Sequence, residues 1–205
     1  MIDAALAALT RKSHVDMTLG EIAKIAGTQP SMIRYYFGNM DGLLTAVSDH
    51  LTRHTEERLA EAEKELDPEK GAAEPIVRAL VGIYYNLPFA AARSIMVIEA
   101  LRPGSSLIGN FRSRTAKKIV VRMIRMIRSS VAHGTYSWNL DVRTAVLSIM
   151  SMTTGPMACI PMLDAGQNGA TFDQEAWIRH AGLMLDKSFR AEAIGDASRD
   201  SAASE

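Results

Sequence analysis

Apolar residues recur three and four positions apart along most of the chain, and alternation of apolar with polar residues never persists. The first spacing places apolar side chains on one face of an α-helix, whereas a half-buried strand requires the second. Glycine and proline residues divide the pattern into about nine helical stretches. We therefore expect an all-α protein. The stretches on which the interpretation depends are Ile2–Leu9, Leu19–Ala26, Gln29–Phe37, Asp41–Leu66, Phe111–Val131, Asp141–Leu163 and Asp173–Phe189.

The second and third of these stretches have the layout of a helix-turn-helix. Thr18 and Glu21 have the spacing of a capping box, which predicts that a helix begins there. Gly27 follows where that helix would end in a left-handed residue, a conformation that glycine adopts at little cost. Pro30 then occupies an early position of the next helix, where its missing N–H is not needed.

The third stretch is the candidate recognition helix. Ile33 and Phe37 are four residues apart and are expected to face the core, which leaves the other side chains exposed. A helix of this size fits the major groove, where Gln and Arg can bond base edges and hydroxyl groups can bond phosphates. The predicted DNA-binding residues are Thr18, Gln29, Ser31, Met32, Arg34, Tyr35, Tyr36 and Asn39.

This N-terminal segment resembles the DNA-binding domain of the tetracycline-repressor (TetR) family. The positions that fall in register with the family pattern are Thr18, Ile22, Ala23, Ala26, Gly27, Ile33, Tyr36, Phe37, Asn39, Asp41, Leu43 and Leu44. The resemblance implies a helix-turn-helix domain over residues 1–46 and a larger helical ligand-binding and dimerisation domain over residues 47–190. Residues 191–205 are mostly Ala, Ser and Asp, so we expect a disordered tail there.

Two positions depart from the family pattern. Met40 stands where the family usually has a lysine that resembles a phosphate clamp, so one phosphate contact is expected to be lost. Arg34 stands where the family usually has a tyrosine, and it can bond a phosphate or a guanine. Our hypothesis is that Arg34 does part of what Met40 cannot.

The C-terminal part carries the features that the resemblance assigns to a ligand cavity and a dimer interface. Methionine is common there, and it suits either an adaptable pocket or an ordinary core. Family analogy gives a pocket of Tyr84, Tyr85, Met96, Phe111, Met123 and Trp138. The last two helices have apolar faces that a lone pair cannot hide, which favours a homodimer. The predicted dimerisation residues are Val146, Ile149, Met150, Trp177, Ala181, Met184 and Leu185.

The charged residues narrow the choice of partners. The chain has 23 basic and 23 acidic residues, so its overall charge gives no reason to expect nucleic acid or an anionic membrane. A row of basic residues follows one face of the Phe111–Val131 stretch, and we interpret it as solvated or salt-bridged. Its members are Arg114, Lys118, Arg122, Arg125 and Arg128.

Cys159 is the single cysteine, which excludes an internal disulfide and fits a reducing cytoplasm. No apolar run approaches the roughly 20 residues of a membrane span, so we expect no membrane partner.

Catalytic and metal-binding patterns are weak. Gly104–Gly109 misses the nucleophile elbow because Ile108 occupies the place of its second glycine, and we expect neither an enzyme nor a cofactor. His50, His54 and Glu57 share one side of a helix, but two histidines without a further donor make a weak site, so no metal is predicted.

The resemblance implies a cytoplasmic transcriptional repressor that binds a palindromic double-stranded operator as a homodimer. A small, apolar effector in the C-terminal cavity would release it from DNA. The alternative is a helical adaptor or scaffold whose DNA-binding head is weakened, as Met40 and the acidic balance of residues 1–50 would permit.

Overall fold

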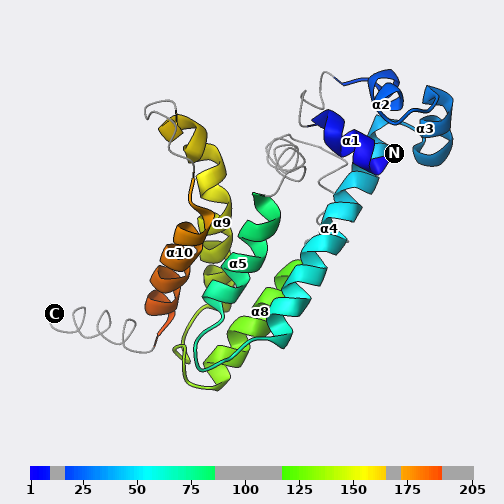
Figure 1. The fold of residues 1–205 in the computed structure, drawn as a ribbon. Coiled ribbons are helices and arrows are strands. Elements are labelled where there is room, and N and C mark those ends of the chain that lie inside the picture. The colour runs from blue at the N-terminus through cyan, green and yellow to red at the C-terminus, as the bar shows by residue number, and fades with distance from the viewer. Residues whose placement is uncertain (10–16, 86–116, 165–171, 191–205) are drawn as a thin grey trace, which may run out of the picture. The chain divides into compact units, whose positions relative to one another are not determined.

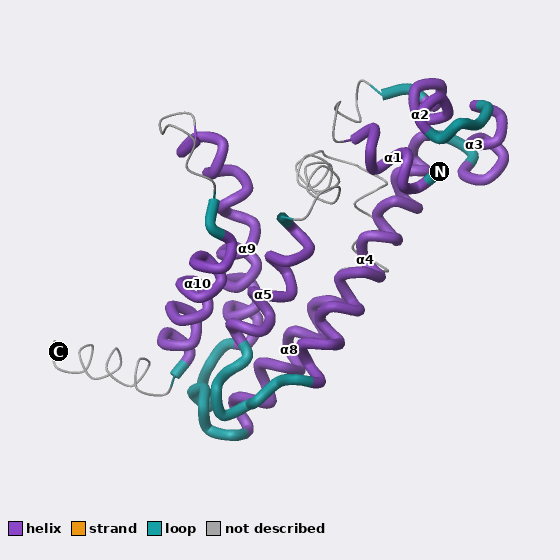
Figure 2. Tube along the Cα trace, in the orientation of Figure 1, coloured by secondary structure: helices purple, strands orange, loops and turns teal. Residues whose placement is uncertain are grey.

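The structure is a computed structural model that describes residues 1–9, 17–85, 117–164 and 172–190. The described residues form helices and loops, and none of them forms a strand (Figure 2). Eight helices lie in these ranges, as Figure 1 labels them. Their bounds are α1 Ile2–Leu9, α2 Leu19–Ile25, α3 Pro30–Phe37, α4 Met40–Lys64, α5 Ala73–Tyr84, α8 Lys117–Ala132, α9 Val142–Asp164 and α10 Gln174–Phe189. The all-α prediction is confirmed.

The helices agree with the expected stretches to within a few residues. The Phe111–Val131 prediction is covered only from Lys117 onward, where α8 begins, and its first six residues lie outside the described residues. The predicted tail at 191–205 also lies outside them. None of the described helices combines the length and the apolar character that crossing a bilayer requires.

The chain divides into two compact units, one of residues 1–57 and 83–119 and one of residues 58–82 and 120–205. Within the first unit, α1, α2, α3 and the first turns of α4 form what we call the head. Its core is a single apolar cluster, in which α1 packs against α2 and α2 against α3. The buried members of the cluster are Ala5, Leu6, Ala8, Met17, Ile22, Ala23, Ile33, Leu43, Leu44 and Val47.

Local hydrogen bonds define the ends of the head's helices. The backbone N–H of Thr18 donates to Glu21 Oε2 at 2.8 Å, and the Glu21 N–H donates back to Thr18 Oγ1 at 3.2 Å. This reciprocal pair is the predicted capping box, and α2 begins directly after Thr18. Gly27 has φ +62°, the left-handed conformation expected at the end of that helix.

The second unit has its own core, made by α5, α8, α9, α10 and the end of α4. Helices α9 and α10 pack against each other, and their inward faces are buried. The largest fully buried side chains of this unit are Leu59, Ile76, Leu80, Met123, Met126, Ile127, Tyr136 and Ile149.

A buried polar contact joins three separate parts of this second unit. The Tyr136 hydroxyl accepts hydrogen bonds from the backbone N–H groups of Ala72 and Ala73, at 2.7 and 2.8 Å, and donates one to Asp186. The first turn of a helix has N–H groups without partners inside the helix, and here a tyrosine from a distant loop satisfies two of them at the start of α5. Gly71, with φ +104°, leaves the space that Tyr136 and Asp186 occupy.

Ion pairs link α4 to α8. Within the second unit, Glu63 binds Arg122 and Arg125, the latter at 3.1 Å, and within the first unit Lys118 lies 3.7 Å from Glu56. Three residues of the predicted basic row are therefore salt-bridged, as the interpretation of that row expected.

Candidate nucleic-acid interface

Helix α3 has one buried side and one exposed side. Ile33 is fully buried and Phe37 is partly buried against the head core, as their spacing predicts. All eight predicted DNA-binding residues are exposed. Tyr35 and Tyr36 are the most prominent, 80% and 58% exposed, and their rings meet edge to face with centroids 5.1 Å apart. The helix therefore presents aromatic, amide, hydroxyl and guanidinium groups to solvent.

Two of the eight residues also cap helices, a role for which only one of them showed a sequence signal. Thr18 belongs to the predicted capping box, and its hydroxyl donates to Glu21 Oε2 at 2.9 Å. Asn39 Oδ1 accepts a hydrogen bond from the Gly42 N–H at 2.9 Å and so caps α4. Thr18, directly before α2, and Asn39, between α3 and α4, are thus each held in place by a hydrogen bond of their own side chain.

The two departures from the family pattern have different surroundings. Arg34 is exposed on α3, and it is the single charged residue of that helix. Met40 is partly buried and packs against the head core. In place of the lysine usual in the family, this chain gains apolar contact inside the head. The positive charge of α3 therefore rests on Arg34.

Comparison with known proteins finds sequence similarity over a short segment only. No protein-family model matches the chain. The HTH-type transcriptional regulators BetI of Brucella anthropi and Brucella canis are each 38% identical to it over 53 residues. That match covers 26% of this chain and 27% of each regulator, so it spans about a quarter of the length of these curated relatives.

Solved structures match nearly the whole chain. The TetR-family regulator PfmR of Thermus thermophilus has a TM-score of 0.68 at 18% identity, over 90% of this chain and 96% of that one. This chain has the TetR fold. FadR of Bacillus subtilis, solved with stearoyl-CoA, has a TM-score of 0.77 at 19% identity, over 92% of this chain and 97% of that one. The resemblance seen in residues 1–46 thus extends, as a fold, to the TetR-type helices that follow.

The predicted effector-pocket residues are placed only in part. Met96, Phe111 and the side chain of Tyr84 lie outside the described residues, while Tyr85 is partly buried. Met123 is fully buried in the core, and Trp138 is 86% exposed in the loop before α9. The described residues do not bring Met123 and Trp138 to one cavity, and this pocket stays a prediction.

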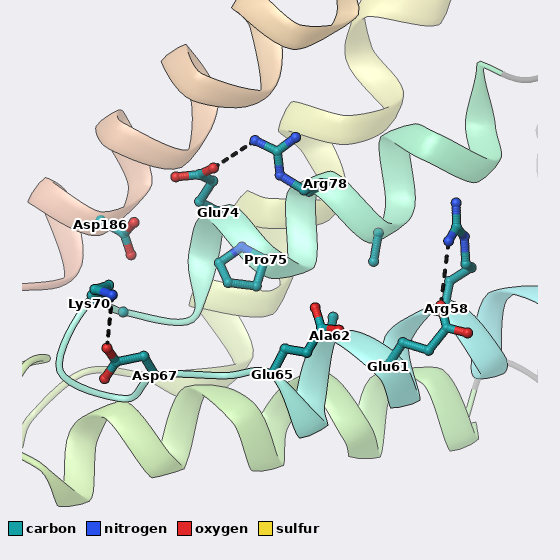
Figure 3. A pocket seen from close by; sticks show the side chains of 12 residues that line it. Arg58, Glu61, Ala62, Glu65, Asp67, Lys70, Glu74, Pro75, Arg78 and Asp186 are labelled. Atoms are coloured by element: carbon teal, nitrogen blue, oxygen red, sulfur yellow. Dashed lines mark hydrogen bonds and ion pairs between the residues drawn. The ribbon is translucent and has the colours of Figure 1, made fainter.

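A polar pocket of about 460 Å³ lies between the end of α4, the start of α5 and Asp186 of α10 (Figure 3). Figure 3 shows that its charged side chains are largely paired with one another, as in the Lys70–Asp67 contact at 3.2 Å. The hydrogen bond from Lys70 lowers the pKa of Asp67 below its ordinary value. Burial instead raises the pKa of Asp186.

Arg78 is paired with two carboxylates of the second unit. Its guanidinium group binds both carboxylate oxygens of Glu175, at 2.7 and 2.8 Å, and Glu74 at 2.8 Å. The hydrogen bond from Arg78 lowers the pKa of Glu175. Among the described residues, no three His, Cys, Asp or Glu side chains converge as a metal site requires, and His54 instead lies 3.5 Å from Glu57.

A second, apolar pocket of about 800 Å³ opens along α9 and α10. Trp177, Met184 and Leu185 of the predicted dimerisation set line it. Val146, Ile149 and Ala181 of that set, as well as Leu185, are buried within the chain itself, and Met150 and Trp177 are partly buried. Among the residues of these helices whose side chains the structure describes, the exposed large apolar ones are Leu147, Leu183 and Met184. Helical periodicity found the helices but did not separate the face toward the chain's own core from the face toward solvent.

Proposed function

We propose that this chain is a ligand-responsive transcriptional repressor that binds operator DNA through α3. The observation that carries the proposal is the exposed face of that helix, with Gln29, Ser31, Arg34 and Tyr36 pointing away from the core on a TetR fold. Side chains of these types bond base edges and phosphates in the major groove. The capping box and the buried Ile33 hold the helix in place behind that face.

The proposed repressor acts as a homodimer on a palindromic operator. The apolar pocket along α9 and α10, whose lining includes the exposed Leu147 and Met184, is the surface we assign to the second copy. Exposed apolar surface of this kind gives two copies a reason to associate, because association removes it from water. Two heads related by a twofold axis would then read two half-sites about one DNA turn apart.

The proposed effector is a small molecule with an apolar part. FadR of Bacillus subtilis was solved with stearoyl-CoA, and AibR was solved with isovaleryl coenzyme A and operator DNA. Acyl thioesters of coenzyme A are therefore the first compounds to test here. A ligand releases the repressor only to the extent that it binds the DNA-free state more tightly. The proposed role is regulatory and cytoplasmic, with no catalytic step.

The test begins with selection of DNA by the full chain from a random duplex library. We expect a palindromic sequence to be enriched and to bind with strong salt dependence. Failure to enrich any sequence at low salt would support the adaptor alternative. Stearoyl-CoA and isovaleryl-CoA are then added to the complex with the selected duplex, and release of DNA identifies the effector class.

Arg34→Ala tests the charge assigned to α3. We expect about tenfold weaker binding to the selected duplex, with the slope of log affinity against log salt reduced by about one. Arg128→Ala removes a charge that is also exposed, on α8, and serves as the control, for which we expect wild-type binding. An Arg34→Ala chain with wild-type affinity and salt slope would contradict the hypothesis that Arg34 compensates for Met40.

A further inference from the structure

The connection between α3 and α4 consists of two residues, Gly38 and Asn39. Gly38 has φ +78° and ψ −66°, and the Asn39 N–H donates to the Phe37 carbonyl oxygen at 2.9 Å across it. These values describe a γ-turn of positive φ, the tightest reversal that a backbone makes and one that side chains other than glycine adopt only with strain. The chain therefore has little freedom between the recognition helix and the next helix.

Two further contacts, both made by Gly42 in the first turn of α4, restrict this connection. Asn39 Oδ1 accepts from the Gly42 N–H, which fixes the first turn of α4 to the connecting residue. The backbone of Gly42 lies directly against the last residue of α3. A Cβ atom at position 42 would overlap the Phe37 carbonyl oxygen and would lie 3.0 Å from its carbonyl carbon. Because both obstructing atoms are backbone, no side chain at position 42 fits unless α3 and α4 move apart.

The turns of α4 that follow are anchored in the head. Leu43, Leu44 and Val47 are buried in the same apolar cluster as Ile33 of α3. Beyond them α4 continues as one helix to Lys64, and near that end Glu63 binds Arg122 and Arg125 within the second unit. We call the contact between α3 and α4 at Gly38, Asn39 and Gly42 the joint. Helix α4 thus has the joint at its first turn and ion pairs to α8 at its last turn.

We propose that Gly42 is a positioning residue, which lets α3 and α4 meet as one rigid body so that the recognition helix has a fixed angle to α4. The γ-turn at Gly38, the Asn39 cap and the missing side chain at Gly42 act together, and any substitution at position 42 changes that angle. The inference rests on the proposed DNA-binding function. It adds that the presentation of α3 is set by a backbone contact rather than by any side chain that touches DNA.

The first experiment compares glycine-to-alanine substitutions within the head. Alanine at position 42 meets the Phe37 backbone, whereas alanine at Gly20, also a helical position, meets only Thr18 Oγ1 at an ordinary 3.8 Å. On the duplex selected by the wild-type chain, we expect Gly42→Ala to bind about tenfold more weakly, and Gly20→Ala to stay within about twofold of the wild type. We expect both variants to bind random-sequence DNA as the wild type does, because phosphate contacts do not require one helix angle.

A third variant separates a changed angle from a merely weakened head. Gly27→Ala places a side chain at φ +62° with no atom within 4 Å, so it strains the head without touching the joint. Thermal unfolding of the three variants ranks the loss of stability. We expect Gly42→Ala to bind the selected duplex more weakly than Gly27→Ala does, even if Gly27→Ala destabilises the protein as much as Gly42→Ala or more. Equal affinities for Gly42→Ala and Gly20→Ala would overturn the proposal.

The second experiment needs no DNA and so separates failure of this inference from failure of the proposed function. Spin labels are attached at Ser31→Cys on α3 and Arg53→Cys on α4, with Cys159→Ser to remove the native thiol. We expect one narrow distance distribution in the otherwise wild-type chain and a shifted or broadened one after Gly42→Ala. A broad or two-peaked distribution in the parent chain would overturn the rigid joint, even if the Gly42→Ala chain does not fold.

Discussion

The polar contacts inside the head and those inside the second unit differ in their separation along the sequence. In the head, the polar contacts that fix the helix ends join residues three apart, as in Thr18 with Glu21 and Asn39 with Gly42. In the second unit, Tyr136 binds Asp186 across 50 positions and Ala72 across 64, and Arg78 binds Glu175 across 97. The head is a locally specified structure over one small core, whereas the second unit depends on polar side chains brought together by the fold.

This difference predicts where each part of the molecule is vulnerable. The head should unfold when a buried side chain of its core is truncated. Its capping contacts cannot compensate, because they are exposed and each stabilises a helix end by only about 1 kcal/mol. The second unit has a larger core and should tolerate small cavities better. It should respond strongly to the loss of a buried hydroxyl that several backbone groups share.

The largest effect is expected from Ile33→Ala. Ile33 is fully buried between α3 and the rest of the head core, and a buried Ile→Ala truncation destabilises a protein by about 2–5 kcal/mol. Hydrogen exchange should show loss of protection in α1–α3 while α9 and α10 keep theirs. Ile25→Ala is the control, since Ile25 is 43% exposed on the neighbouring helix and should change stability little. Equal loss of protection in both units would contradict the comparison.

An intermediate effect is expected from Tyr136→Phe. The ring still packs edge to face on Phe189, with centroids 5.4 Å apart, but the Ala72 N–H loses its acceptor and the Ala73 N–H keeps only the longer hydrogen bond to Asp186 Oδ1 at 3.4 Å. Leaving buried donors without partners costs about 1–3 kcal/mol. Urea unfolding should show this loss in the second unit, while affinity for the selected DNA stays unchanged in the folded protein.

Tyr35→Phe is the matched control for that substitution. Tyr35 is 80% exposed, so loss of its hydroxyl should leave stability unchanged. It should weaken DNA binding instead, if the hydroxyl bonds a phosphate as predicted. A Tyr136→Phe chain as stable as the wild type would mean that the shared hydroxyl contributes nothing to the second unit.

The same contrast explains what could be predicted from the sequence. Thr18, Glu21, Gly27 and Pro30 have conformational preferences that act within a few residues, so the helix-turn-helix followed from their order. The exposed face of α3 followed from the spacing of two apolar residues. In the second unit, by contrast, nothing near Tyr136 in the sequence indicates that its hydroxyl lies at the start of α5.

The packing faces of α9 and α10 were not predictable from the spacing of their apolar residues. Helices α9 and α10 have apolar residues on more than one side, so periodicity did not tell buried Val146 and Ile149 from exposed Leu147. The joint at Gly42 was also invisible, because its cause is the absence of a side chain. A glycine in a helical pattern lowers helix propensity, and only the three-dimensional contact with Phe37 gives it a role.

The smallest expected effect concerns the pH dependence of the second unit. Burial raises the pKa of Asp186 above its ordinary 3.8 and outweighs the hydrogen bonds from Tyr136 and the Ala73 N–H and the charge of Arg190, which all lower the pKa, while Glu74 raises it further. A carboxyl group whose folded pKa is raised contributes stability that is fully present below the unfolded pKa and is lost as pH rises through the folded pKa. Asp186→Asn resembles the protonated form and keeps an oxygen acceptor for Tyr136. The variant should therefore gain stability relative to the wild type as pH rises from below 3.8 toward neutrality.

Glu175→Gln gives a control of opposite sign. Arg78 lowers the pKa of Glu175 from its ordinary 4.5, so this carboxylate contributes stability above that value and loses it as pH falls. The wild type should therefore exceed Glu175→Gln in stability at neutral pH, and that difference should shrink on acidification. Urea midpoints measured from pH 3 to pH 7 on both variants check the pair of signs. If Asp186→Asn instead lost stability relative to the wild type as pH rose, the Asp186 carboxylate would be better solvated than its burial beside Tyr136 implies, and the second unit would resemble the head in resting on its apolar core.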